Sequence, residues 1–185
     1  MDLTSPNLVD ELTPHTDGLE IGLLVYNAGA EPGIGLFLER QAEDALYLVD
    51  LNCRGPLLLA HHFGQAMAQR GRGGIVLTTT AGAVSGTGYV GAYTASKAFV
   101  QIFGEALWCE LGQHHVDVLV AMVGPTDTPA LRATGADLEP LRPVLMESRD
   151  VVAEVLAGLG SAGTSAADRA RQPGRRAAGL AGATG

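Results

Sequence analysis

The sequence predicts an α/β fold built on a parallel sheet. Three short, continuous apolar runs have the length and composition of buried strands, and longer segments of helical period separate them along the chain. Strands that alternate with helices are typical of parallel sheets, because each crossover between parallel strands needs a long connection. The runs expected to form strands are residues 21–26, 74–79 and 116–123.

The first run, residues 21–26, stops at Asn27-Ala28-Gly29, as expected for a strand that is buried on both faces. Helices are predicted at about 41–70 and at about 92–112, between the strands. The second helix carries one broad apolar stripe of the kind that packs on a core, formed by Phe99, Ile102, Phe103, Ala106, Leu107 and Leu111.

The segment after the third strand, residues 124–148, contains four prolines and is predicted to be a loop with short helical pieces over the sheet. Long loops of this kind often cover a site. Its large apolar residues suggest the wall of an apolar pocket: Leu131, Leu138, Leu141, Val144, Leu145 and Met146. A last helix is expected at about 149–159, with Ser148 as its N-cap and Gly160 at its end.

Composition divides the chain into one domain and a tail. The 185 residues are 46% hydrophobic and 17% charged, which suits a single globular domain over residues 1–160. Residues 161–185 are mostly Ala, Gly, Arg and Ser, with Leu180 as their only large aliphatic residue. We expect this tail to be disordered, because it has too little apolar surface to bury.

Charge and hydropathy exclude several classes of partner. The formal net charge of -8 argues against a surface for nucleic acid. No apolar run reaches the roughly 18 residues of a membrane span, and the start Met-Asp-Leu-Thr-Ser-Pro does not resemble a secretory signal. We therefore expect a cytoplasmic protein that binds neither nucleic acid nor membrane.

The cysteines and paired histidines do not predict a metal site. Cys53 and Cys109 each lie within an apolar helical segment, so buried thiols are favoured over a disulfide framework or metal ligands. The histidines of the pairs His61-His62 and His114-His115 are adjacent, so within a helix their side chains diverge by about 100 degrees. No third ligand is in register with them, and solvated or interface histidines are the favoured interpretation.

Tyr93 and Lys97 are the residues most indicative of chemistry, because they are four residues apart at the expected start of a helix. That spacing places both side chains on one face. A free tyrosine has a pKa of about 10, and a nearby cation favours its phenolate form. Such a pair can pass a proton to or from a carbonyl or alcohol oxygen. Taken alone, the same spacing also fits a buried tyrosine and a solvated lysine.

Five motifs, in order along the chain, resemble those of the short-chain dehydrogenase/reductase family. They are Asn27-Ala28-Gly29, Asn52 in Leu-Asn-Cys-Arg-Gly-Pro, the hydroxyl-rich strand end at 75–80, Tyr93 with Lys97, and the segment 123–128. In the last of these, Val123 replaces the proline with which the family's motif begins. The similarity runs from about residue 2 to about residue 158 and implies a Rossmann-type, doubly wound parallel sheet.

The resemblance implies a role for each matching residue. Tyr93 would be the general acid in carbonyl reduction and the base in alcohol oxidation. Lys97 would lower the pKa of Tyr93 and hold the ribose hydroxyls of the cofactor, NAD or NADP. Asn52 would fix a water in a proton relay, since an amide can donate and accept at once. The remaining residues implied to contact the cofactor are Asn27, Ala28 and Gly29 at its adenosine side, Gly124, Thr126 and Thr128 at its carboxamide, and Asp2 at its adenine. By the resemblance, Asp2 would lie at the end of a strand.

Threonine stands where the family normally has a catalytic serine. The position thirteen residues before Tyr93 is Thr80, and it follows Thr78 and Thr79. A threonine hydroxyl can also donate to a substrate oxygen, although its methyl group narrows the choice of rotamers. Spacing favours Thr80 for this role and leaves Thr79 as the alternative; a row of β-forming threonines with no such role is the remaining interpretation.

A second departure concerns the glycine-rich phosphate loop, which in the family lies between the first strand and the first helix. No such loop precedes Asn27 in this sequence. The resemblance therefore predicts a partial Rossmann-type sheet that lacks the first βαβ unit. The strand at 21–26 would lose the parallel neighbour from that unit and expose backbone donors and apolar faces that a complete sheet buries. We expect a chain of this kind to be poorly soluble or to depend on a partner.

A glycine motif elsewhere, Gly86-Thr87-Gly88-Tyr89-Val90-Gly91, matches the pattern of a dinucleotide loop but is not interpreted as one. The acidic residue at the expected distance, Glu110, lies within a predicted helix rather than at the end of a second strand. The favoured interpretation is a flexible loop between Thr80 and Tyr93.

The sequence thus predicts an NAD(P)-dependent oxidoreductase of the short-chain type that acts on a secondary alcohol or ketone. The main alternative is a non-catalytic, N-terminally truncated remnant without the phosphate loop. A third hypothesis is a binding or scaffold protein that uses the helices at 53–70 and 92–111, which the resemblance implies as the surface of a homo-oligomer.

Overall fold

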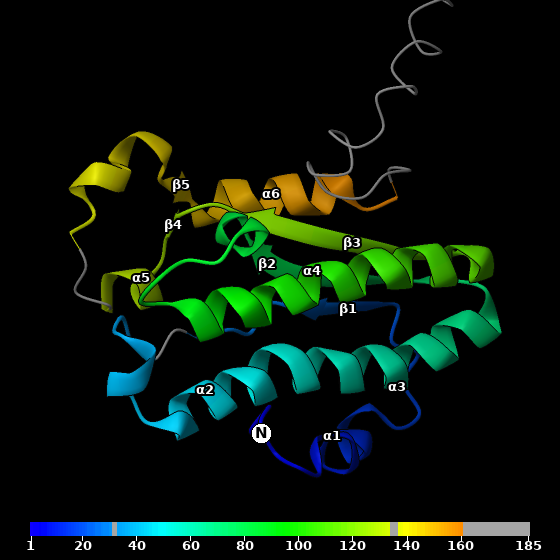
Figure 1. Ribbon diagram of the computed structural model, residues 1–185. Helices are drawn as coiled ribbons and strands as arrows, with labels where there is room; N and C mark the ends of the chain where they lie inside the picture. Colours follow the sequence, from blue (N-terminus) through cyan, green and yellow to red (C-terminus); the bar gives the residue numbers. More distant parts are fainter. Residues whose placement is uncertain (31–32, 134–136, 161–185) are drawn as a thin grey trace, which may run out of the picture.

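The computed structural model describes residues 1–30, 33–133 and 137–160, and it confirms the predicted α/β fold with a parallel sheet. Strands β1 (Leu23–Tyr26), β2 (Gly73–Thr80) and β3 (Val116–Val123) pair in the order β1-β2-β3 (Figure 1). Leu24 is opposite Ile75, and Leu77 is opposite Val120. Because all three strands run the same way, their carboxyl ends lie at one edge of the sheet.

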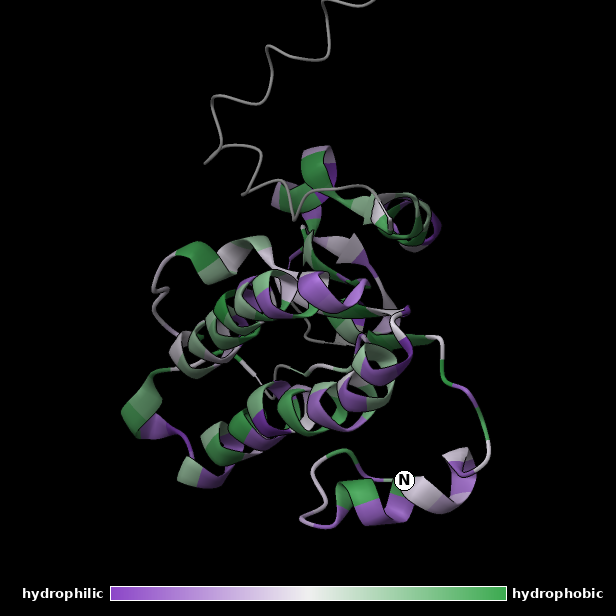
Figure 2. Cartoon of the chain, turned by 90° about the vertical axis from the view of Figure 1, so that its right-hand side faces the viewer, coloured by the Kyte–Doolittle hydropathy of each residue, from purple (hydrophilic) through white to green (hydrophobic). Residues whose placement is uncertain are grey.

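Helices cover the two faces of this sheet. Helix α4 (Gly91–Leu111) packs so closely on β3 that Gly104 leaves no room for a Cβ against Val120. On the other face, Gly158 of helix α6 (Ser148–Gly158) lies against Leu119. Successive strand residues point to opposite faces, so the sheet lies between α4 and α6. Helix α3 (Gly55–Arg70) runs beside α4 on the same face (Figures 1 and 2).

Strand β1 is buried on one face only, so the prediction of burial on both faces was wrong. Leu24 and Tyr26 are in the core, whereas Leu23 is 41% and Val25 is 50% exposed. Strand β2 is the only neighbour of β1 in the described sheet. The continuous apolar run does form a strand, but the apolar side chains on its outer face are exposed.

The helix predicted at 41–70 is interrupted by a π turn. Helix α2 (Ala42–Val49) leads into a π-helical segment (Asp50–Arg54), and α3 follows directly. Within the turn the Gly55 N–H donates to the Asp50 carbonyl, five residues back. Pro56 explains this widening, because proline has no N–H and its ring would collide with the carbonyl four residues before it.

Helix α1 (Leu8–Thr16) precedes the sheet, although no helix was predicted before residue 21. It carries Pro14 and only one fully buried residue, Leu8, which packs in the core. Its short length and interrupted apolar period give a weak sequence signal.

The segment after β3 contains the expected short helical pieces, α5 (Pro129–Ala133) and a 3₁₀ helix (Glu139–Val144). Two short strands not foreseen from the sequence, β4 (Thr126–Asp127) and β5 (Met146–Glu147), also pair in parallel here. Ser148 is the first residue of α6 rather than its N-cap, which is Glu147. The Ser148 hydroxyl donates to the Asp127 carbonyl at 2.9 Å. Further 3₁₀ turns span Phe37–Glu39, Ala81–Val84 and Gly112–His114. The predicted tail lies outside the described residues.

The buried face of α4 is partly polar, which differs from the prediction for its apolar stripe. Phe103 and Leu107 pack against the core, but Ile102 is 61% exposed. The side chains that face inward are Thr94, Ser96, Lys97, Val100 and Gln101, together with Gly104. An apolar surface therefore remains on the outer side of α4.

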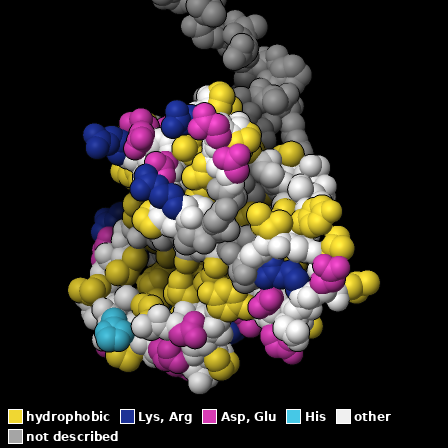
Figure 3. All heavy atoms as spheres, turned by 90° about the vertical axis from the view of Figure 1, so that its left-hand side faces the viewer, with side chains coloured by type: hydrophobic (Ala, Val, Ile, Leu, Met, Phe, Trp, Pro, Cys, Tyr) yellow, Lys and Arg dark blue, Asp and Glu magenta, His cyan; other side chains and the backbone are white. Residues whose placement is uncertain are grey.

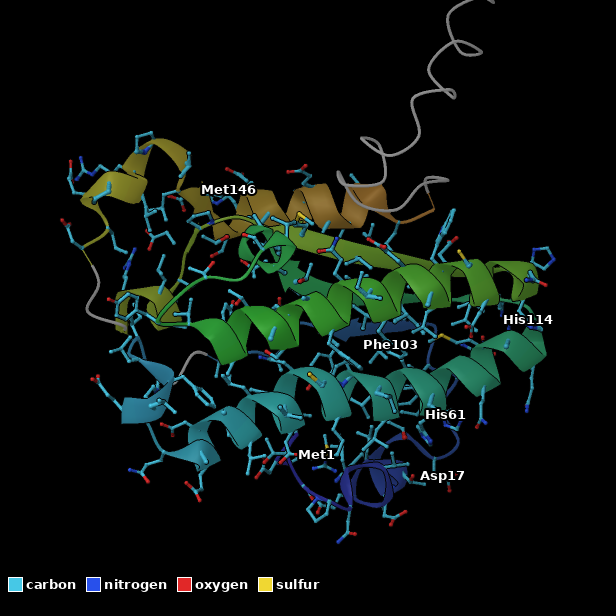
Figure 4. The ribbon with its side chains drawn as sticks, in the orientation of Figure 1. Met1, Asp17, His61, Phe103, His114 and Met146 are labelled. Atoms are coloured by element: carbon cyan, nitrogen blue, oxygen red, sulfur yellow. The ribbon has the colours of Figure 1, made fainter. Side chains whose placement is uncertain are left out.

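None of the described helices is long and apolar enough to cross a membrane. Figure 4 shows His61 on α3 and His114 beyond the end of α4, and among the described residues no group of three His, Cys, Asp or Glu could hold a metal ion. Both cysteines are free, and Cys109 is exposed, so the expectation of a buried thiol was wrong there.

Candidate active site

The carboxyl ends of β1 and β2 bring three predicted site residues together. Gly29 follows β1, Lys97 is on α4 and Asn52 is in the π turn. A Cβ on Gly29 would lie 2.9 Å from Lys97 Nζ and 3.5 Å from Asn52 Oδ1. A larger residue at position 29 would displace the ammonium. Figure 3 views this end of the sheet, where the surface is hollowed and lined with hydrophobic side chains.

Lys97 is the only lysine of the chain and is 5% exposed. Its Nζ donates to the Thr78 carbonyl, at the end of β2, at 3.1 Å. Burial lowers the pKa of this ammonium, and the Cys53 thiol partly opposes the change. A buried cation is thus held where three elements converge.

Asn52 is 1% exposed and only half satisfied. Its Nδ2 donates to Ser96 Oγ at 2.9 Å, and Ser96 Oγ donates to the Tyr93 carbonyl at 2.8 Å. Its Oδ1 has no hydrogen-bond partner among the described residues. A buried amide oxygen without a donor is costly, and a bound water or hydroxyl would satisfy it.

Tyr93 lies in the first turn of α4 and lines a cavity of about 290 Å³. It precedes Lys97 by four residues on the same helix, so the predicted common face is present. The other walls come from two loops and α2, and include Leu36, Phe37, Ala45, Leu48, Tyr89 and Val90. The six apolar residues expected from the segment 124–148 do not line this cavity or the neighbouring one, and their role as a pocket wall stays a prediction.

Two loops that form part of the cavity wall are hydrogen-bonded to each other. The Gly35 N–H donates to the Tyr89 carbonyl at 3.0 Å, and Tyr89 has a positive φ of 68°. Arg40 in the wall pairs with Asp44 at 3.2 Å and donates to the Gly33 carbonyl. Residues 87–91 of the glycine motif therefore form part of the cavity wall. Because Arg40 and Asp44 are oppositely charged, the net charge of the lining is close to zero.

The two candidate threonines have different surroundings. Thr79 is buried, and its hydroxyl donates to the Lys97 carbonyl at 2.7 Å, which fastens β2 to α4. Thr80, at the end of β2, is half-buried and accepts a bond from the Gly82 N–H at 3.4 Å. Because the Thr79 hydroxyl already donates to a backbone carbonyl, Thr80 is the better candidate for contact with a substrate.

The remaining cofactor candidates lie on separate segments. Thr126 Oγ1 donates to the Gly124 carbonyl at 3.0 Å, and Thr128 Oγ1 accepts from the Leu131 N–H at 3.1 Å. These bonds shape the segment that leaves β3. Asp2 is not at a strand end as expected, because residues 1–4 form no strand. Its carboxylate accepts from the Thr4 N–H, which lowers the Asp2 pKa.

Sequence reasoning missed Ser96 and Tyr26. Ser96 links Asn52 to the backbone of Tyr93. The buried Tyr26 hydroxyl donates to the Leu51 carbonyl at 2.5 Å. Ser96 lies within the Tyr-Thr-Ala-Ser-Lys stretch and Tyr26 directly precedes Asn27, so proximity to recognised motifs was the only available signal.

Comparison with known proteins identifies related sequences. The family model described as short chain dehydrogenase matches residues 1–139. A very-long-chain 3-oxoacyl-CoA reductase of Neurospora crassa is 35% identical over 102 residues, which are 55% of this chain and 31% of the relative. A 7beta-hydroxysteroid dehydrogenase of Collinsella aerofaciens is 26% identical over 162 residues, or 86% of this chain and 61% of the relative.

Solved structures show the same similarity. A short-chain dehydrogenase from Sphingobium yanoikuyae in complex with NADPH superposes with a TM-score of 0.75 at 28% identity, covering 85% of this chain and 61% of that one. A bulky-bulky ketone specific alcohol dehydrogenase from Comamonas testosteroni gives 0.71 at 28% identity, covering 85% and 59%. The chain thus spans between 31% and 61% of the length of these four relatives.

Proposed function

The chain belongs to the short-chain dehydrogenase family, and we propose from this that it exchanges hydride between NAD or NADP and a secondary alcohol or ketone. In the proposed reaction Tyr93 gives its hydroxyl proton to the carbonyl oxygen during reduction and takes one back during oxidation. Thr80 donates a hydrogen bond to the same oxygen. The coenzyme, when bound, supplies or accepts the hydride.

This proposal depends on one observation: the structure brings Gly29, Lys97 and Asn52 together near Tyr93. A buried ammonium four residues along the helix favours the phenolate of Tyr93. Asn52 Oδ1 is buried and has no hydrogen-bond partner within the described part of the chain, which suits a water that hydrogen-bonds Lys97 and returns protons to Tyr93. Glycine at position 29 leaves room for the ammonium at the sheet edge, where a Cβ would lie 2.9 Å from Lys97 Nζ.

The same residues fit the nicotinamide end of a coenzyme. Lys97 would bind the ribose hydroxyls, and the segment Gly124, Thr126 and Thr128 would bind the carboxamide. Asn27, Ala28 and Gly29 would contact the adenosine side, and Asp2 would contact the adenine. The Sphingobium yanoikuyae neighbour, which is 28% identical, was solved with NADPH. That relationship supports a nicotinamide coenzyme and leaves open the choice between NAD and NADP.

The cavity beside Tyr93 favours a neutral, apolar ketone or alcohol as the substrate. Its charged residues, Arg40 and Asp44, neutralise one another, and its walls are otherwise mainly apolar. A volume of about 290 Å³ accommodates a bulky group. Relatives named for hydroxysteroids and for bulky ketones support the same class. The free cysteines suit a reducing compartment, so we place the reaction in the cytoplasm.

Titration of the purified chain with NADH and NADPH tests the proposal. We expect the nicotinamide fluorescence to change on binding of at least one coenzyme, and an apolar ketone to oxidise the bound coenzyme. Absence of binding to both at millimolar concentration would refute the enzyme hypothesis for this chain. It would favour the non-catalytic or scaffold alternatives, for which the open side chains Leu23 and Val25 offer a contact surface.

We further propose that the outer surface of α3 and α4 mediates self-association. Ile102, Phe99 and Leu57 are exposed there, next to a mostly apolar groove of about 450 Å³ between α2 and α4. We expect Ile102→Asp to shift the sedimentation coefficient from that of an oligomer to that of a monomer, because an interface cannot bury the unpaired carboxylate cheaply. Leu156→Asp, on α6 across the sheet, is the control and should leave sedimentation unchanged. A native chain that sediments as a monomer would contradict the proposal.

A further inference from the structure

The carbonyl of Leu51 has lost its usual partners within the π turn. In an α-helix it would accept from the N–H of residue 55, and in a π turn from that of residue 56. The Gly55 N–H donates to Asp50 instead, and Pro56 has no N–H. The carbonyl therefore needs a donor from outside the helix.

Tyr26 supplies that donor from strand β1. Its hydroxyl lies 2.5 Å from the Leu51 oxygen, and its side chain is 5% exposed. Burial raises the pKa of Tyr26 to about 12, so the hydroxyl keeps its proton and remains a donor at neutral pH. Gly55 leaves the necessary space, because a Cβ there would overlap the Tyr26 hydroxyl oxygen.

The anchored carbonyl belongs to the residue directly before Asn52. Asn52 in turn donates to Ser96 Oγ, which donates to the backbone of Tyr93. A shift of the π turn would therefore move the Asn52 side-chain oxygen relative to Lys97 and disturb the start of α4. We propose that Tyr26 is a positioning residue that fixes Asn52 through the π turn. The kinetic consequence of this inference rests on the proposed oxidoreductase function.

Tyr26→Phe removes the donor while keeping the ring in the core. We expect the side-chain amide signals of Asn52 in the ¹H–¹⁵N NMR spectrum, identified by their loss in Asn52→Asp, to shift and to exchange faster with solvent. We expect kcat for ketone reduction to fall about tenfold at nearly constant KM, as for the loss of one buried hydrogen bond. Tyr47→Phe is the matched control, because the Tyr47 side chain is 43% exposed on α2; neither quantity should change in it.

Gly55→Ala tests the same contact from the other side. Alanine normally favours a helix over glycine, yet here its Cβ should displace the Tyr26 hydroxyl and reproduce the Tyr26→Phe effects. Because both changes break one hydrogen bond, the double variant should be no worse than the more severe single variant.

Two results would overturn the inference: native Asn52 amide signals in Tyr26→Phe, or effects of the two substitutions that multiply. The amide signals report on Asn52 without any turnover. If the native chain proves inactive, the proposed function fails, and the NMR comparison still decides the role of Tyr26.

Discussion

Tyr93→Phe is expected to reduce the turnover of an apolar ketone at least about a hundredfold, the low end of the effect of losing a general acid. The substitution removes one hydroxyl from a side chain that lines the cavity and leaves the ring in place. Coenzyme binding, followed by nicotinamide fluorescence, should change little, because the loss concerns a proton transferred in the transition state. A fall in kcat without a comparable change in coenzyme affinity is therefore the expected signature.

Tyr89→Phe is the matched control for this experiment. Tyr89 lines the same cavity, but its side chain is 60% exposed and its backbone carbonyl makes the bond to Gly35. We expect near-native kcat for Tyr89→Phe. Comparable activity of the native chain and Tyr93→Phe would contradict the assignment of Tyr93 as the acid and base.

Lys97→Met is expected to make the chain more stable and also inactive. The native fold buries an ammonium for which the structure gives one carbonyl acceptor, that of Thr78. Burying a charge with so little compensation costs free energy. A methionine of similar length should recover on the order of 1 kcal/mol of unfolding free energy at pH 7. Ketone turnover should fall about a hundredfold or more, because Tyr93 loses the neighbouring cation.

The stability gain of Lys97→Met should depend on pH in a defined direction. Burial places the folded-state pKa of Lys97 below its ordinary value of 10.5. Between these two values the unfolded chain binds more protons than the folded chain, so native stability rises with pH in that window. The advantage of the variant should therefore be full below the folded-state pKa and shrink as pH approaches 10.5.

Thermal unfolding at pH 7 and at pH 10 measures this effect. Gln101→Met replaces another buried polar residue of α4 that does not titrate, and its stability difference from the native chain should stay constant between the two pH values. A Lys97→Met variant that is less stable than the native chain at pH 7 would show that the ammonium stabilises the fold.

The strands of the main sheet could be predicted from sequence because they are short, continuous apolar runs, and the main helices because their apolar residues recur with a helical period. The site could be predicted in part: Asn52, Tyr93 and Lys97 belong to motifs, and Gly29 together with Lys97 and Asn52 does lie at one place. Which side of α4 is buried could not be predicted, because the candidate site places polar residues on the buried side of this helix. Ile102 consequently lies outside, although it reads as a core residue. The apolar run of β1 indicated burial on both faces. Its exposure agrees instead with the prediction of a partial sheet, since β2 is the only neighbour of β1 among the described residues.

The π turn could be predicted from the sequence only in part. Pro56 in the helical segment at 41–70 was a visible signal of a break in the hydrogen-bond ladder. The sequence did not reveal that the chain would absorb the proline by widening one turn instead of ending the helix. The Leu51 carbonyl of the widened turn accepts from Tyr26, which is thirty residues away from Pro56 in the sequence and contacts the turn only in the folded structure.

The burial of the only lysine also makes the folded chain a substrate that a lysine-specific protease cannot easily cut. Lys97 lies in the second turn of α4 and is buried, and no other position in the 185 residues offers the required side chain. Cleavage at that single bond requires α4 to detach, so its rate reports the opening of the active-site helix. A ligand that binds at the sheet edge should slow this cut, which gives a readout of occupancy independent of any chemical turnover.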